Sequence, residues 1–185
     1  MSDTSKWPLA EALIVAETLM CVLEHRAERV IIAGSIRRRK QMVGDIELLY
    51  IPRFEPRKID LLNKAKVNVA DECIDQLLAC GQLAKRTNAK GSEVWGAKNK
   101  LAVHVPTGIP VDLFATDADS WWNYLVCRTG PAESNMRIAQ AARQRGWTWN
   151  PYQDGFTTPN GYIHCGTERY VFEAVGLPYR EPWER

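Results

Sequence analysis

Two acidic residues at a short, regular spacing are the first candidates for chemistry in this chain. Asp45 and Glu47 stand two residues apart in the run Gly44–Leu49, which has the alternation of a β-strand. Side chains at positions i and i+2 of a strand leave the same face of a sheet, so the two carboxylates should lie close together. They would repel each other unless a cation lay between them, and oxygen ligands on a rigid strand suit Mg²⁺ or Mn²⁺.

A third acid, Asp112, lies within the apolar run Val111–Phe114. A carboxylate in such a run needs a partner or a metal ion, because burying an unpaired charge is costly. Three acids on neighbouring strands can bridge two metal ions, the arrangement that supports in-line displacement at a triphosphate. An Asp-x-Glu pair is also common on a solvated sheet face, and the pair alone leaves that alternative open.

Residues suited to phosphate come before the acid pair. The apolar run Val30–Ile32 leads into Gly34 and Ser35, a turn whose backbone N–H groups and hydroxyl can approach a phosphate. Arg37 follows with a planar guanidinium that suits bidentate phosphate contact. A Gly-Ser turn and a basic run are each common on their own. Their order, followed by the acids, indicates a site for metal-dependent phosphoryl transfer.

The surrounding pattern predicts the elements that must position these residues. Apolar spacing and end signals predict helices over 9–26, 59–80 with a break near Asn68, 120–127, 133–145 and 167–175. Strands are predicted over 30–32, 46–51, 94–104 and 111–115, with short β segments near 147–149 and 162–164. A shift in composition after Asp117 indicates a small second lobe.

Composition bounds the class of protein. The chain has 185 residues, of which 45% are hydrophobic and 25% charged, which fits one globular domain or two small ones. No apolar run approaches the roughly 20 residues of a membrane span, and no signal peptide is evident at the N-terminus, so we expect a protein that is not secreted. None of the five cysteines forms a Cys-x-x-Cys pair, which disfavours a zinc site or a disulfide framework.

The formal charge of +2 conceals a segmented distribution. Residues 35–58 and 83–100 each carry +4 and residues 128–145 carry +3, whereas 1–26 and 59–82 each carry −2. A near-neutral total therefore does not exclude a nucleic-acid partner for the basic stretches.

Three stretches together resemble the family X DNA polymerases, members of the polymerase β-like nucleotidyltransferase superfamily. The run Ala33–Arg38, closing in Gly44–Leu49, is similar to the family's palm signature. The run Arg128–Asn135 resembles its thumb, and Thr167–Arg185 its carboxyl-terminal signature. The resemblance implies an α+β fold. A nucleotidyltransferase palm, a mixed β-sheet with helices on one face, would span residues 1–116. A small α/β thumb would span 117–185, without lyase or fingers domains.

The resemblance also implies roles for individual residues. The catalytic acids, which would bind two Mg²⁺ ions or Mn²⁺, would be Asp45, Glu47 and Asp112. The nucleotide would be bound by Gly34, Ser35, Arg37, Gly44, Thr129, Gly130 and Asn135, with Gly44 allowing close packing before Asp45. DNA contacts would come from Arg38, Lys85, Arg86, Lys98, Lys100, Arg128, Arg137 and Arg143.

Some positions depart from the family pattern. Glu47 replaces the usual Asp, and Cys127 and Arg128 stand where the family has two aromatic residues. Ala139 and Pro110 replace basic residues found in many members. These changes predict relaxed fidelity or unusual substrate choice.

The function that the resemblance implies is template-directed DNA synthesis on short gaps in DNA repair. The partners would be gapped or primer-template DNA and deoxynucleoside triphosphates. The chain would act as a monomer in the cytoplasm or associated with the nucleoid, and a viral origin stays open because some minimal palm-and-thumb members of the family are viral. Two alternatives stay open: a nucleotidyltransferase with a non-DNA acceptor, and a catalytically weak DNA-binding repair module.

Overall fold

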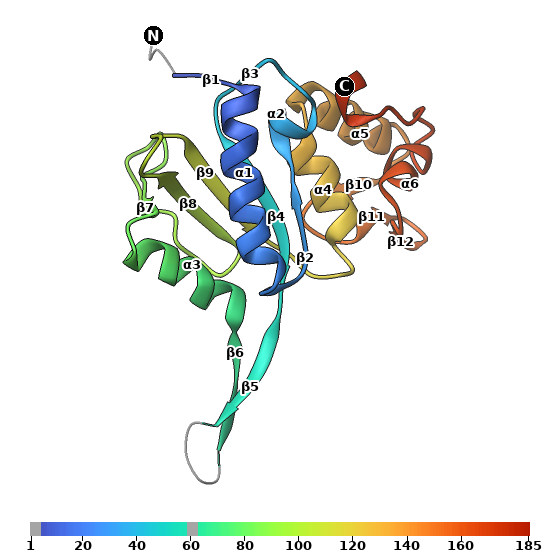
Figure 1. Ribbon diagram of the computed structural model, residues 1–185. Helices are drawn as coiled ribbons and strands as arrows, with labels where there is room; N and C mark the ends of the chain where they lie inside the picture. Colours follow the sequence, from blue (N-terminus) through green and yellow to red (C-terminus); the bar gives the residue numbers. More distant parts are fainter. Residues whose placement is uncertain (1–4, 59–62) are drawn as a thin grey trace.

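The elements follow one another in a mixed α and β order. The computed structural model describes residues 5–58 and 63–185 (Figure 1). Its helices are α1 (Leu9–Glu24), α2 (Gly34–Arg37), α3 (Val69–Ala79), α4 (Trp121–Thr129), α5 (Ala132–Gln144), α6 (Glu168–Glu173) and the 3₁₀ turn η1 (Pro182–Glu184). Its strands are β1 (Trp7–Pro8), β2 (Ala27–Ile32), β3 (Met42–Val43), β4 (Ile46–Pro52), β5 (Phe54–Lys58), β6 (Lys64–Asn68), β7 (Leu83–Lys85), β8 (Asn99–His104), β9 (Pro110–Ala115), β10 (Thr148–Asn150), β11 (Gly155–Thr158) and β12 (Gly161–His164).

A five-stranded mixed sheet forms the first half of the fold. Its strand order is β2-β4-β9-β8-β7, and only β4 and β9 pair in parallel. In β4, Leu48 and Tyr50 point to one face and Leu49 to the other, as the period of a strand requires. The two predicted strands that carry acids are therefore confirmed, and they are direct neighbours.

Helices cover this sheet unequally. The helices α1 and α3 pack on the face that carries Leu48 and Tyr50, where they enclose the main hydrophobic core (Figure 1). The helix α4 packs on the opposite face through Trp121 and Leu125, which contact Leu49 and Phe114. The sheet is thus the surface on which the two halves of the chain meet.

The second half has a core of its own. The three-stranded sheet β10-β11-β12 packs with α5 and α6 around buried residues that include Ile138, Phe156 and Phe172. The predicted helices over 120–127, 133–145 and 167–175 are confirmed with end shifts of a few residues. Thr167 begins α6 by accepting a hydrogen bond from the backbone N–H of Tyr170 over 3.1 Å.

The predicted helix over 59–80 is wrong in its first part. Residues 59–62 lie outside the described residues, and β6 occupies Lys64–Asn68, paired with β5 as a hairpin. The helix α3 begins only at Val69, because the Asn68 side chain caps it by accepting from Ala70 N and Asp71 N over 3.1 Å each. Similarly, the strand predicted from Val94 begins at Asn99. Among the described residues, no helix is long and apolar enough to span a membrane.

Candidate active site

The three predicted acids lie at one end of the paired strands β4 and β9. Glu47 and Asp112 are register partners in the parallel ladder, and Asp45 directly precedes β4. Glu47 and Asp112 share the sheet face of Leu49 and Phe114, on which α4 packs. The site therefore lies on the face of the sheet that looks toward the C-terminal half.

Partial burial and mutual repulsion disfavour the charged forms of these acids. Burial, reinforced by the neighbouring Asp45 charge and to a lesser degree by Asp112, raises the pKa of Glu47 to about 8. Burial also raises the pKa of Asp45 and of Asp112, although Arg86 acts in the opposite direction on both. A site that holds several carboxylates in a desolvated space stores unfavourable electrostatic energy that a bound cation would relieve.

Arginines surround the acids. The Arg86 guanidinium donates to Asp112 Oδ1 and, through Nε, to the Ala102 carbonyl over 3.0 Å. Arg38 and Arg128 are the cations that act on Glu47. Arg86, which the sequence places among the DNA contacts, is thus the direct partner of a candidate catalytic acid.

The Gly34–Ser35 turn lies against Glu47. Gly34 has a φ of +62°, and a Cβ at this position would collide with the Glu47 carboxylate, so glycine is required on both counts. The Ser35 hydroxyl oxygen is buried and has no hydrogen-bond partner among the described residues. Three further predicted site residues have buried unpartnered atoms of the same kind: Arg38 Nε, Arg128 Nε and Asn135 Oδ1. Unpartnered buried polar atoms gathered in one region indicate a place for a polar ligand.

The donor set fits a hard divalent cation, but the side chains are not gathered for one. Within residues 5–58 and 63–185, no group of three or more His, Cys, Asp or Glu side chains is arranged so that it could hold a metal ion. Asp112 is drawn to Arg86, and Glu47 lies against Gly34. The three partly buried carboxylates still supply the oxygen ligands and the excess negative charge that Mg²⁺ favours.

The two adjacent arginines of the Gly-Ser segment hold Thr129 in different ways. Arg37 Nη1 donates to the Thr129 hydroxyl over 2.7 Å, whereas Arg38 Nη1 donates to the Thr129 carbonyl. Arg38 Nη1 also lies 3.2 Å from where a Cβ of Gly130 would be, which leaves little room for a side chain there. Arg38 faces the acids, and Arg37 faces away from them toward α6.

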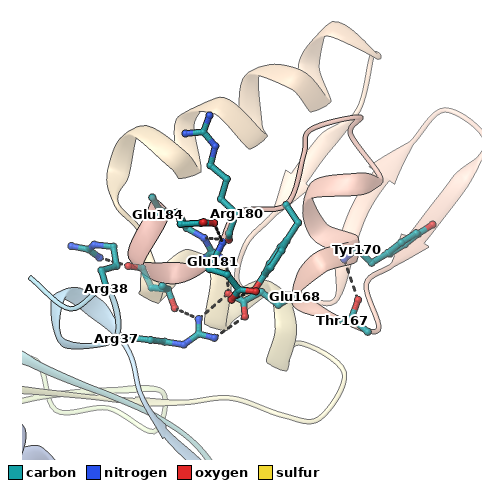
Figure 2. A network of polar contacts seen from close by, with 11 residues as sticks. Arg37, Arg38, Thr167, Glu168, Tyr170, Arg180, Glu181 and Glu184 are labelled. Atoms are coloured by element: carbon teal, nitrogen blue, oxygen red, sulfur yellow. Dashed lines mark hydrogen bonds and ion pairs between the residues drawn. The ribbon is translucent and has the colours of Figure 1, made fainter.

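Arg37 forms a buried ion pair that joins the two halves of the chain. Its guanidinium makes a bidentate contact with Glu168, over 2.8 Å to Oε1 and 2.7 Å to Oε2 (Figure 2). Arg185 Nη2 donates to Glu168 Oε1 over 2.8 Å, and its side chain is 1% exposed. Burial alone would raise the pKa of Glu168, but the hydrogen bond and charge of Arg37, with the charge of Arg185, lower it overall. We call the three residues Arg37, Glu168 and Arg185 the interlobe triad.

The triad disfavours the expectation that Arg37 binds the triphosphate, since three of its N–H groups are engaged by Glu168 and Thr129. Lys100 is corrected as a DNA contact, because its Nζ is buried and bound to Asp71 over 2.8 Å and to the Gly96 carbonyl over 3.1 Å. Gly44 does not serve close packing, since a Cβ there would meet no atom within 4 Å.

The remaining predicted residues differ in their surroundings. Asn135 donates through Nδ2 to the Cys127 carbonyl over 2.8 Å, which ties α5 to the end of α4. Lys85 pairs with Glu93 over 3.0 Å, and Lys98, Arg137 and Arg143 are exposed.

Arg128 lines a cleft that the sequence did not reveal. Its guanidinium stacks on the Phe114 ring at 3.6 Å and lies within 5.5 Å of the Tyr152 ring centre. The cleft has a volume of about 560 Å³ and is lined in part by Lys98, Asn99, Arg128 and Tyr152. None of the three acids lines this cleft, and Arg128 is the residue that links it to them, because its charge also acts on Glu47 and Asp112.

Comparisons with known proteins agree with this architecture. Residues 124–185 match the family model of the DNA polymerase beta thumb. Two solved structures of Leishmania infantum polymerase beta, a ternary P/T complex and a ternary gap complex, each superpose with a TM-score of 0.75 at 18% sequence identity. They cover 98% of this chain, which spans 77% and 71% of theirs. No curated protein sequence matches the chain.

The chain therefore has the polymerase β fold, an α+β architecture in which a mixed five-stranded sheet is followed by a C-terminal thumb. The thumb family model supports the resemblance to the family X DNA polymerases over residues 124–185, and the two solved structures show the polymerase β fold over 98% of the chain.

The interlobe triad should carry a large share of the stability of the thumb. Replacing Glu168 by Gln leaves Arg37 and Arg185 without a counter-charge, and breaking a buried pair in this way costs roughly 3 kcal/mol or more. Glu173→Gln is the matched control on the same helix, since its contact with Arg169 is exposed at 3.8 Å and should contribute below about 0.5 kcal/mol. Urea unfolding measures both, and equal midpoints for the two variants would contradict this role.

The same variants give a prediction for pH. Because the pKa of Glu168 is lowered from its ordinary value of 4.5, its contribution is fully present above that value and is lost as pH falls through the lower folded-state pKa. The free energy of unfolding of wild type should therefore exceed that of Glu168→Gln by a constant amount above about pH 5, and the difference should narrow at lower pH. A difference that grows on acidification would refute the assignment.

Proposed function

We propose that this chain is a DNA-directed DNA polymerase that extends a primer 3′-hydroxyl across short gaps in DNA repair, with residues 1–116 as palm and 117–185 as thumb. One observation carries the proposal: the partly buried acids of β4 and β9 lie beside Gly34, which precedes the unpartnered Ser35 hydroxyl, and near Arg38, which donates to the Thr129 carbonyl. Acids beside phosphate-binding donors form a site for nucleotidyl transfer. The similarity to polymerase beta in a P/T complex and a gap complex supports DNA as the acceptor.

Each group in the site has a role that its position allows. Asp45, Glu47 and Asp112 would hold two Mg²⁺ ions, which would activate the attacking hydroxyl and stabilise the departing pyrophosphate. The Gly34–Ser35 turn offers a hydroxyl and a close backbone approach to the triphosphate. Arg86 orients Asp112 by its hydrogen bond.

Arg38 takes the triphosphate role that the sequence favours for Arg37. Its Nε is unpartnered and buried, and its guanidinium lies between the acids and the Thr129 carbonyl. A planar cation beside the Gly-Ser turn suits bidentate phosphate contact. Asn135, fixed by Cys127, keeps one free acceptor that can meet the base of the nucleotide.

A second candidate is a DNA-binding repair module with little activity. It is favoured by the same geometry that keeps Asp112 on Arg86, so that no three acids are gathered within the described residues. The two candidates differ in whether a nucleotide is added.

Primer extension on a one-nucleotide gap distinguishes them. Wild type should extend the primer with Mg²⁺ and stop when the ion is chelated, and Asp112→Asn should lose activity by a factor of about a hundred or more, because developing charge loses its stabilisation. The exposed acid of Asp75→Asn on α3 is the control and should leave activity unchanged. Gapped DNA bound by wild type without any extension would support the second candidate instead.

Replacing Arg37 and replacing Arg38 should have different effects on the KM for the nucleotide. Arg38→Ala should raise the KM for the nucleotide about tenfold to a hundredfold, since it removes charged hydrogen bonds to phosphate. Arg37→Ala should leave the KM within a few fold at a temperature where it remains folded, and should lower the unfolding midpoint. Steady-state kinetics and urea unfolding on both variants test this. A larger KM effect in Arg37→Ala would restore the expectation made from the sequence.

A further inference from the structure

The β5–β6 hairpin carries a basic surface away from the candidate site. The β5–β6 hairpin projects from the end of the sheet opposite to α2, as a ribbon that continues the line of β4 (Figure 1). Its register pairs Phe54 with Asn68, Pro56 with Lys66 and Lys58 with Lys64. Alternation then places one set of side chains on one face of the ribbon, which we call the lysine face: Phe54, Pro56, Lys58, Lys64 and Lys66.

The lysine face has no counter-charge of its own. All five of its residues are exposed, and within residues 5–58 and 63–185 none of its three lysines has an ion-pair partner. Lys58 and Lys64 stand directly opposite each other, a like-charge pair that is unfavourable in a free ribbon. Phe54, 52% exposed, adds an apolar surface at the base of the same face.

The opposite face of the ribbon is neutralised and anchored. Arg57 Nη2 donates to Glu72 Oε2 on α3 over 2.9 Å, and Arg53 pairs with Glu55 over 3.2 Å. One face of the ribbon is therefore held against α3. The lysine face, on which every charged residue is positive, is exposed to solvent. Segregation of this kind distinguishes a binding surface from a ribbon with randomly scattered charges.

We propose that the lysine face binds the sugar-phosphate backbone of duplex DNA about one helical turn from the candidate site. The proposal rests on the proposed function in one respect, that the candidate site holds the end of the same duplex. At about 3.3 Å per residue, Lys58 lies up to roughly 36 Å from Glu47 along β4 and β5, close to the rise of one turn of B-DNA, about ten base pairs. Lysine ammonium groups are suited to phosphate contacts that do not depend on sequence.

The test is DNA binding by fluorescence anisotropy without nucleotide or metal ion. The triple variant Lys58→Ser, Lys64→Ser and Lys66→Ser should bind a gapped substrate with 16 upstream base pairs at least about tenfold more weakly at low salt, and the slope of log affinity against log salt should fall by about 2 to 3. On a substrate with only 6 upstream base pairs, wild type and variant should bind alike.

The matched control replaces the same three lysines by Arg, which keeps the charge and should keep both affinity and salt slope. Light scattering on each variant checks that the ribbon stays monomeric, because edge lysines also prevent strands of different molecules from pairing. Unchanged binding of the long substrate by the serine variant overturns the proposal and leaves another partner, such as an acidic protein, for this face. Equal losses on the long and short substrates overturn the assigned position of the contact.

The DNA-binding assay tests the lysine face and the primer-extension assay tests the polymerase activity, so either proposal can be refuted without the other. Weakened binding by the serine variant with no primer extension by wild type would uphold the lysine face and refute the polymerase. Extension by wild type with unaltered binding by the serine variant would do the reverse.

Discussion

Three acidic side chains lie close together at one end of two parallel strands, and many contacts of this structure offset their charge. Pairing β4 with β9 places Glu47 opposite Asp112, and Asp45 adds a third charge beside them. Burial and repulsion both disfavour their ionised forms. Three arginines from different segments lie near these acids: Arg86 from between β7 and β8, Arg38 from the Gly-Ser segment and Arg128 from α4. The same cations that stabilise the acids come from both halves of the chain, so electrostatics at the site and attachment of the thumb are coupled.

Thr129 is a residue through which hydrogen bonds connect the two halves of the chain directly. Its hydroxyl accepts from Arg37 and its carbonyl from Arg38, so the last residue of α2 and the residue after it both hold the last residue of α4. Arg37 in turn is fixed by Glu168, which Arg185 also holds near the end of the sequence. A displacement of α6 would therefore reach the Gly34–Ser35 turn through rigid, buried contacts. The thumb and the Gly34–Ser35 turn are therefore linked by one continuous network of contacts.

Local signals in the sequence sufficed for the strands, most helices and the acids of the candidate site. Alternation and apolar runs predict β2, β4 and β9 because each buried strand must show its period. The hairpin β5–β6 was not predicted, since its exposed face is charged and its short alternation resembles part of a polar helix. Asn68, noted only as a break, is the cap that separates strand from helix.

Contacts between distant residues could not be read from the sequence in the same way. Arg37 and Glu168 are separated by 131 positions, and nothing local distinguishes Arg37 from Arg38 as the one that faces the acids. Lys100 looked like a surface cation in a basic stretch, although its alternation within β8 turns it inward to Asp71. The stacking of Arg128 on Phe114 likewise depends on how α4 crosses the sheet.

These internal pairings change how the near-neutral charge of the chain should be interpreted. Arg37, Arg86 and Lys100 contribute to the positive stretches 35–58 and 83–100, yet each is neutralised by an acid from another element. The basic surface is therefore smaller than the stretch charges indicate, and the lysines that have no ion pair within residues 5–58 and 63–185 include the three of the ribbon. Because phosphate affinity depends on cations that remain free to release counterions, the proposed attraction for DNA would have to come from cations that are not paired in this way. Arg37 and Arg86 are instead held by acids within the fold.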